Sequence, residues 1–125
     1  MVQVTQEDCS LHTPIGTPFL SLLTYNRGGT VTDTTSNPMG FPAVRGPGHG
    51  VWSKTGNHTF KAYTIAFVTL NGVLTRTQTI LQTIEVDSSD TYKVTAASVK
   101  FFAPDGTLLS TGCATATAKR FELAD

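Results

Sequence analysis

The sequence predicts an all-β protein, built as a single antiparallel up-and-down β-barrel of seven or eight strands. Threonine supplies 22 of the 125 residues, and β-branched residues suit a pleated sheet better than a helix. Tight-turn signals recur at regular intervals through the second half of the chain, and the segments between them are unusually long. A two-sheet sandwich is the alternative architecture.

Length and charge restrict the classes of protein that remain. A chain of 125 residues is one domain's worth, so residues 1–125 are expected to form one barrel domain. Nine basic residues balance nine acidic ones, which leaves no basic surface for nucleic acid. No apolar run approaches the ~20 residues that span a bilayer, so no membrane partner is expected. The cellular compartment stays open.

The first half of the chain is less regular than the second. Residues 1–18 are expected to form an N-terminal arm or a short edge strand, followed by strands over 19–25 and 30–35 that join at a glycine-containing turn. Residues 36–48 are rich in proline and glycine and predict a long irregular loop, of the kind that often forms a lid or the wall of a site.

From residue 50 onward, strands and turns alternate. Strands are expected over 50–54, 59–70, 73–86, 92–102 and 107–121, and Asn71-Gly72 is the strongest hairpin signal because both residues tolerate the conformation of a type I′ turn. The later strands would extend about 35–50 Å, too far for a flat sandwich of this size. Tilted strands in a closed barrel accommodate such lengths and leave no free edge. The sequence does not fix which face of each strand points inward.

Two cysteines, Cys9 and Cys113, allow one disulfide between the arm and the last strand. A single pair in a domain of this size is not a disulfide scaffold, so two free thiols are the favoured interpretation.

Metal and cofactor chemistry have no sequence signal. The three histidines, His12, His49 and His58, lie apart and have no ligand spacing, so no metal site is expected. Phosphate-binding loops and the Gly-x-Ser-x-Gly motif are absent, so no cofactor is expected.

A few residues are candidates for a site. His49, flanked by glycines where backbone can approach closely, could act as a general base, although a surface turn is the simpler interpretation. Arg76 lies in mid-strand and either faces solvent or enters the lumen. Trp52 is expected mainly as a plug of the barrel. The candidate catalytic residues are His49, Tyr63 and Arg76, and the candidate ligand-binding residues are Trp52, Phe60, Phe67, Tyr92 and Phe101.

One fragment resembles a known family. Gly50-Val51-Trp52, with Arg120 near the end of the last strand, resembles the lipocalin and wider calycin signature, in which an arginine packs across the tryptophan. Unlike in lipocalins, 49 residues precede the Gly-x-Trp segment here and no C-terminal helix is expected. Residues 48–121, ending in Gly112-Cys113-Ala114-Thr115-Ala116, look more like small lipocalin-like or allene-oxide-cyclase-like barrel proteins. The resemblance implies a barrel with an apolar mouth and transfers no catalytic residue.

Three functions fit these observations. The first is binding of a small hydrophobic or mixed-polarity molecule in the lumen. The second is a cofactor-independent isomerase, cyclase or lyase that acts in the same cavity by orienting its substrate. The third is a structural module with a filled core that forms a homo-oligomer. Two ionisable or hydroxyl groups that converge within the cavity would favour catalysis over plain binding.

Overall fold

The computed structural model describes residues 1–121 and contains nine strands. No helix in this range is long and apolar enough to cross a membrane. In chain order the strands are β1 (Val2–Glu7), β2 (Phe19–Asn26), β3 (Thr30–Thr35), β4 (Ala43–Arg45), β5 (Gly48–Lys54), β6 (Thr59–Leu70), β7 (Val73–Val86), β8 (Thr91–Phe102) and β9 (Leu108–Lys119).

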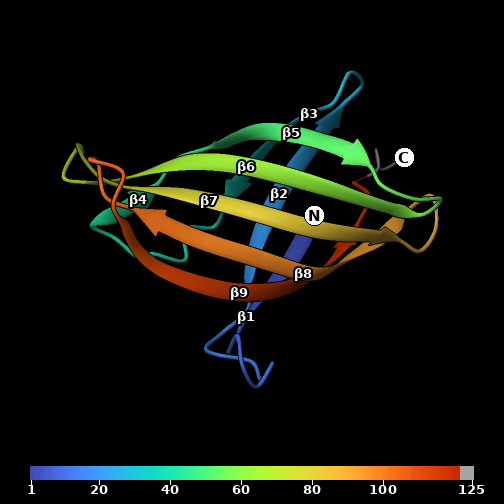
Figure 1. Ribbon diagram of the computed structural model, residues 1–125, viewed down its shortest axis with the longest axis horizontal. Coiled ribbons are helices and arrows are strands. Elements are labelled where there is room, and N and C mark those ends of the chain that lie inside the picture. Colours follow the sequence, from blue (N-terminus) through green and yellow to red (C-terminus); the bar gives the residue numbers. More distant parts are fainter. Residues whose placement is uncertain (122–125) are drawn as a thin grey trace.

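Eight of these strands close into an antiparallel up-and-down barrel, as the sequence predicts. Each barrel strand pairs with its sequence neighbours in the barrel, and β1 pairs with β9 to complete the ring. Figure 1 shows the long strands β6 to β9 side by side, with β1, β2 and β3 crossing behind them. Every barrel strand pairs with a neighbour on both sides, and this excludes the two-sheet sandwich.

The long strands follow from the turns that separate them. Asn71 and Gly72 both adopt positive φ, 52° and 78°, and join β6 to β7 as a tight hairpin. Strands β6 to β9 are 12 to 14 residues long, which confirms the predicted lengths.

The N-terminal arm differs from the prediction. Val2–Glu7 is a full barrel strand with β2 on one side and β9 on the other, so it is not an edge, and the irregular part of the arm begins after Glu7. Six residues give a weak strand pattern, and the partner β9 lies more than a hundred residues away in the sequence.

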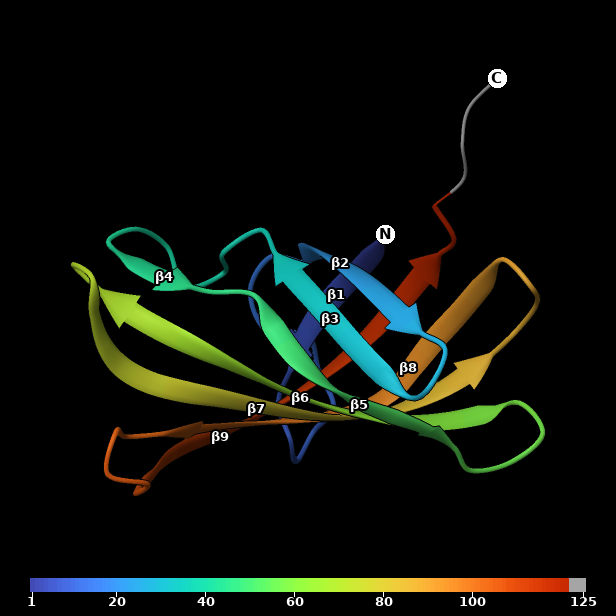
Figure 2. The same ribbon diagram turned by 90° about the horizontal axis from the view of Figure 1, so that it is seen from above.

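The predicted loop over 36–48 also contains a strand. Strand β4 pairs with the end of β6 at Val68–Leu70, beyond the part of β6 that pairs with β5. The amide of Gly46 donates to the carbonyl of Phe67 at 2.8 Å between these two pairings. Strands β4 and β5 therefore pair one after the other with β6 and are separated at Gly46-Pro47 (Figure 2).

The burial of alternate residues shows which face of β6 and which face of β9 point into the barrel. On β6, Ala62, Thr64, Ala66 and Val68 are buried, whereas the residues between them are largely exposed. On β9 the small residues Ala114, Ala116 and Ala118 are buried. Small side chains on two long strands leave space inside the barrel unless large ones opposite fill it.

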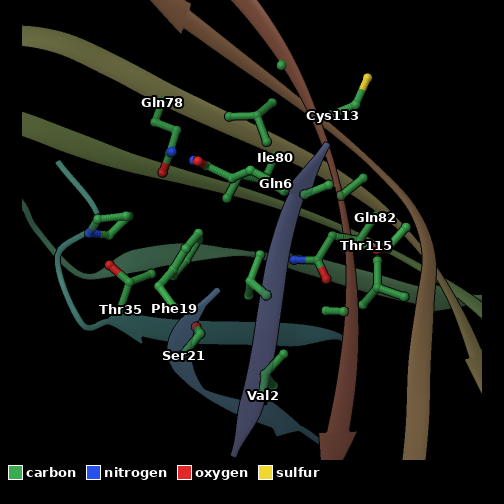
Figure 3. A pocket seen from close by; sticks show the side chains of 18 of the residues that line it. Val2, Gln6, Phe19, Ser21, Thr35, Gln78, Ile80, Gln82, Cys113 and Thr115 are labelled. Carbon is green, nitrogen blue, oxygen red and sulfur yellow. The ribbon is translucent and has the colours of Figure 1, made fainter. Parts of the chain in front are cut away.

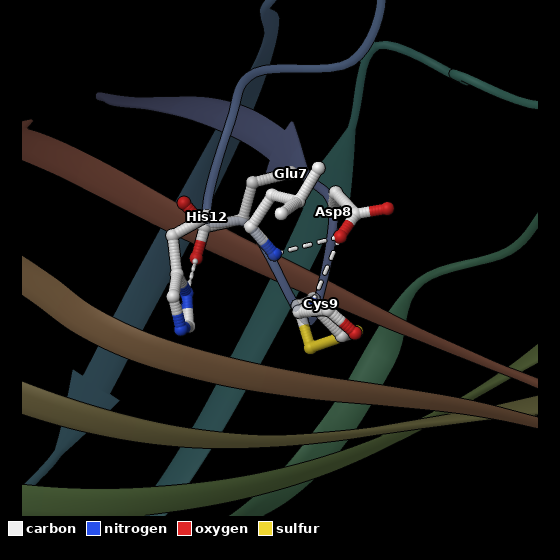
Figure 4. The surroundings of a disulfide bond; sticks show 7 residues. Glu7, Asp8, Cys9 and His12 are labelled. Atoms are coloured by element: carbon white, nitrogen blue, oxygen red, sulfur yellow. Dashed lines mark hydrogen bonds and ion pairs between the residues drawn. A yellow bond between two sulfur atoms is a disulfide. The ribbon is translucent and has the colours of Figure 1, made fainter.

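The two cysteines form a disulfide, so the expectation of free thiols is wrong. Cys9 and Cys113 have Cα atoms 5.2 Å apart and lie 104 residues apart in the sequence. The turn that presents Cys9 is built by Asp8, whose carboxylate accepts hydrogen bonds from the amides of Leu11 and Ser10 at 2.8 and 2.9 Å (Figure 4). These bonds stabilise the charged carboxylate and lower the pKa of Asp8. The disulfide joins this turn to β9.

Candidate functional site

A partly enclosed cavity of about 260 Å³ lies inside the barrel (Figure 3). Inward-facing residues of β1, β2, β3, β7, β8 and β9 surround it. Ile15, Pro38 and Met39, which belong to the irregular segments, also line it. Most of its wall is aliphatic or aromatic carbon. The polar and charged residues along the wall include Gln6, Glu7, Ser21, Asp33, Thr35, Arg45, Gln78 and Gln82.

A buried ion pair forms one part of the wall. Arg45, at the end of β4, contacts both carboxylate oxygens of Asp33 on β3. The two side chains are only 1% and 3% exposed. A pair with this bidentate geometry is among the stronger ionic contacts, and it leaves no net charge at this point of the lumen.

The ion pair depends on a close backbone approach at Gly48. The Gly48 amide donates to Asp33 Oδ1 at 3.0 Å. A Cβ at this position would lie 2.4 Å from the same oxygen, so only glycine admits the carboxylate here. The glycines around His49 do allow a close approach, but the group that approaches Gly48 is the Asp33 carboxylate, and the group that approaches Gly50 is the Tyr63 backbone.

Gln78 on β7 completes this cluster. Its Oε1 accepts a hydrogen bond from Arg45 Nε at 2.8 Å. A guanidinium group has only donors, so the amide oxygen must face it and the amide nitrogen points elsewhere. Of the five guanidinium N–H groups, the contacts to Gln78, Asp33 and the Gly46 carbonyl use four.

Two glutamine amides have free hydrogen-bonding capacity at the cavity. Gln78 and Gln82 are 7% and 9% exposed and share the inward face of β7, with Ile80 between them. Within residues 1–121, neither the Gln78 nitrogen nor the Gln82 amide has a hydrogen-bond partner, and the space they border is the cavity. Figure 3 shows the side chains of Gln6, Gln78 and Gln82 around this space.

One further buried polar group is unpaired. Thr64 Oγ1, on the inward face of β6, has no partner in the part of the chain that the structure describes. Thr64 is fully buried and does not line the cavity, so its hydroxyl is not available to a ligand there.

Aromatic side chains occupy the opposite end of the barrel. Tyr25 packs edge-on against Trp52 and Tyr92, and Trp52 packs against Phe60, with ring centroids 5.8–6.3 Å apart. Trp52 Nε1 donates to the carbonyl of Asn26 at 3.0 Å. A smaller cavity of about 200 Å³ with an apolar wall lies among these rings. Trp52 therefore packs among other aromatic rings at one end of the barrel, where a residue that plugs the barrel is expected.

Burial raises the pKa of both tyrosines in this cluster. The Tyr25 and Tyr92 hydroxyl oxygens are 3.5 Å apart. Desolvation is the largest cause for each, and for Tyr25 the neighbouring Tyr92 adds to it. These hydroxyls are therefore held in the neutral form and are poorly suited to act as bases at neutral pH.

The residues predicted for catalysis do not converge on the cavity. His49 and Tyr63 lie on the outer face of the barrel, where the Tyr63 residue is 40% exposed. The Arg76 guanidinium lies 4.7 Å from the centre of the Phe101 ring, and its Nη2 lies 3.4 Å from Met39 Sδ. None of the three lines the 260 Å³ cavity, so the structure does not bring them together in its wall.

The predicted ligand-binding aromatics are divided between three places. Phe101 lines the main cavity, and Trp52, Phe60 and Tyr92 line the smaller one. Phe67 is 61% exposed on the outer face of β6 and lines neither cavity. Side chains alternate along a strand, so Phe67 points away from the face on which Ala66 and Val68 are buried. Phe67 is therefore excluded as a lumen residue.

Sequence reasoning missed the polar cluster itself. The sequence of β3 carries a signal for this cluster, because Asp33 lies on the same strand face as Val31 and so places a carboxylate on an apolar face. The same holds on β7, where Gln78 and Gln82 alternate with Ile80 and Ile84. A polar residue on an apolar strand face indicates a buried polar contact.

Among residues 1–121, no three His, Cys, Asp or Glu side chains gather as the ligands of a metal ion would. The cation–π contact found in this range is Arg76 over Phe101, whereas Trp52 has Tyr25 and Phe60 as its ring partners. The packing of an arginine on tryptophan that the lipocalin resemblance implies for Arg120 is thus not seen.

The fold and cavity define a class: a small, closed, eight-stranded antiparallel barrel with a calycin-like architecture and a partly polar lumen. Comparison of the chain with models of protein families, with curated proteins and with solved structures finds no match.

Proposed function

We propose that this protein binds a small molecule in the lumen of its barrel. One observation carries the proposal: the 260 Å³ cavity combines a mostly apolar wall with the amide groups of two glutamines that have no hydrogen-bond partner among residues 1–121. Ligand sites in proteins have this composition, an apolar surface with a few placed polar groups. Neither amide is among the fully buried unpaired atoms of residues 1–121, so both are accessible from the cavity and can pair with a ligand that brings a complementary polar group.

A relation to lipocalin-like or allene-oxide-cyclase-like barrel proteins is part of this proposal. Its support is the closed barrel and the position of Gly50-Val51-Trp52 on β5, with the tryptophan ring in the wall of the smaller apolar cavity.

A cofactor-independent isomerase, cyclase or lyase is the second candidate, because two ionisable side chains, Asp33 and Arg45, do converge in the cavity wall. Both Asp33 oxygens already accept hydrogen bonds, from Arg45 and from the Gly48 amide. The arrangement therefore favours binding over proton transfer.

Self-association is compatible with either function. Val51, Tyr63, Ile65, Phe67 and Leu81 are each at least 40% exposed, and the strand registers bring them together on the outer face of β5, β6 and β7. Contiguous exposed apolar groups of this kind are typical of protein interfaces.

Native mass spectrometry of the purified protein tests the proposal. The expected result is a population whose mass exceeds that of the chain by one small molecule, released on denaturation and identified in the extract. The same spectrum gives the oligomeric state. If no adduct is found and no lipophilic fluorescent probe binds to the folded protein, the proposed function is wrong.

A further inference from the structure

The polar groups of the cavity also indicate the chemical class of its ligand. We propose that the ligand is an uncharged, mainly apolar molecule that carries a hydrogen-bond-accepting oxygen, such as an amide, an alcohol or a ketone. This inference rests on the proposed function and adds the nature of the head group to it.

The charges of the cavity wall disfavour an anionic ligand. The cationic group in the cavity wall, Arg45, is already neutralised by Asp33, whose carboxylate it contacts through two nitrogens. A carboxylate ligand would therefore find no unpaired positive charge in the cavity wall to offset the cost of leaving water.

Glu7 adds to this effect. It also lines the cavity, and its side chain is only 14% exposed. Its partner His12 lies 3.3 Å away and is 71% exposed, so solvent screens the histidine more than the glutamate. An anionic ligand is therefore disfavoured by Glu7 as well.

The second argument is the orientation of Gln78. Because its oxygen is held by Arg45 Nε, its NH₂ group is fixed as a donor, and no protein acceptor meets it within the described residues. The residue is more than nine-tenths buried and lines the cavity. A fixed donor at an apolar cavity selects a ligand that brings an acceptor.

The third argument is the chemistry of the remaining polar wall. Gln82, on the same inward face of β7, adds a second amide that has no hydrogen-bond partner in the part of the chain that the structure describes. Amide groups are dipolar and carry no net charge, so they complement uncharged polar groups at a smaller desolvation cost than a charged ligand would carry. An ammonium ligand carries only donors, so it cannot pair with the fixed Gln78 NH₂ group.

Calorimetric titration of the intact protein at neutral pH with four chain-matched probes tests this inference: octanamide, octanol, octanoate and octylammonium. We expect octanamide and octanol to bind at least roughly tenfold more tightly than octanoate and octylammonium. If either charged probe binds as tightly as the neutral ones, the inference is overturned and the proposed function stands. If none of the four binds and no lipophilic probe does, the proposed function fails as well.

A conservative variant tests the role of Gln78 separately. Gln78→Glu keeps an oxygen for Arg45 but removes the NH₂ donor and adds a negative charge. We expect octanamide to bind roughly tenfold more weakly and octylammonium to bind more tightly, so that the difference in affinity between the two probes shrinks or reverses. Gln3→Glu is the matched control, because it adds the same charge at an exposed position of β1. Unchanged affinities in Gln78→Glu, with the fold retained by circular dichroism, would exclude Gln78 as the donor.

Discussion

The Arg45 guanidinium is held against both carboxylate oxygens of Asp33 in the interior of the barrel, although Arg45 comes from β4, which pairs with β6 alone. Three elements meet at this contact: β3 supplies the carboxylate, β4 the guanidinium and β7 the amide of Gln78. The irregular segment 36–47 is thereby fixed to the interior of the barrel from one side, and the cavity gains its polar wall.

Removal of the arginine alone should be costly. In Arg45→Met the Asp33 carboxylate remains buried with only the Gly48 amide as a partner, and an uncompensated buried charge costs about 3–5 kcal/mol. The free energy of unfolding, measured by urea titration at neutral pH, should fall by that amount.

The control for this prediction removes both charges. In the double variant Asp33→Leu with Arg45→Met no charge is left unpaired, so much of the stability should return. A double variant that is as unstable as the sum of the single variants would contradict the view that the lost stability comes from an unpaired charge.

The disulfide should contribute a large part of the stability. Cys9 and Cys113 close a loop with a sequence separation of 104 residues, and restriction of an unfolded loop of that length corresponds to about 4–5 kcal/mol. We expect Cys9→Ala with Cys113→Ala to unfold at a markedly lower urea concentration than the oxidised protein. The oxidised protein treated with a reductant should match the variant, and a reductant that leaves the unfolding midpoint unchanged would show that the bridge does not stabilise the fold.

Alkaline pH should destabilise the barrel through its aromatic end. Burial raises the pKa of Tyr25 and of Tyr92 above the ordinary value of 10.0. As pH rises past about 10, the unfolded chain loses these phenolic protons while the folded chain retains them, so the free energy of unfolding falls with increasing pH. Below pH 10 this contribution is fully present.

The variant Tyr25→Phe with Tyr92→Phe identifies the groups responsible. It has no phenolic protons at these positions, so its stability should decline less steeply above pH 10, as measured by urea unfolding at a series of pH values. A decline as steep as that of the parent would assign the alkaline effect to other groups.

The sequence predicts strands well where a local signal defines both ends. The hairpin at Asn71-Gly72 and the turn after Val86 bound β7, and Thr59–Leu70 and Val73–Val86 match the expected ranges. Strand β1 is short, and one of its two partners, β9, lies more than a hundred residues away, so its place in the ring depends on tertiary pairing that no local pattern encodes.

The site is less predictable for the same reason. His49, Tyr63 and Phe67 carry plausible chemistry, but the inward or outward direction of a strand residue depends on register, and all three point outward. The ion pair joins Asp33 to Arg45 through a loop whose path is set by the pairing of β4 with β6, so their contact could not be derived from spacing.

A substitution inside the cavity separates binding from folding. Gly112 lines the cavity, and a Cβ built on it meets nothing nearer than the Cβ of Val99 at 4.0 Å, so a larger side chain has room to enter. In Gly112→Leu the new side chain should occupy part of the 260 Å³, lower the affinity for neutral ligands by roughly tenfold or more, and change the free energy of unfolding by less than about 1.5 kcal/mol. Calorimetric titration and urea unfolding measure the two effects, with Thr111→Leu on the exposed face of the same strand as the control. If Gly112→Leu binds ligand as tightly as the parent while Thr111→Leu weakens binding, the ligand lies outside the lumen.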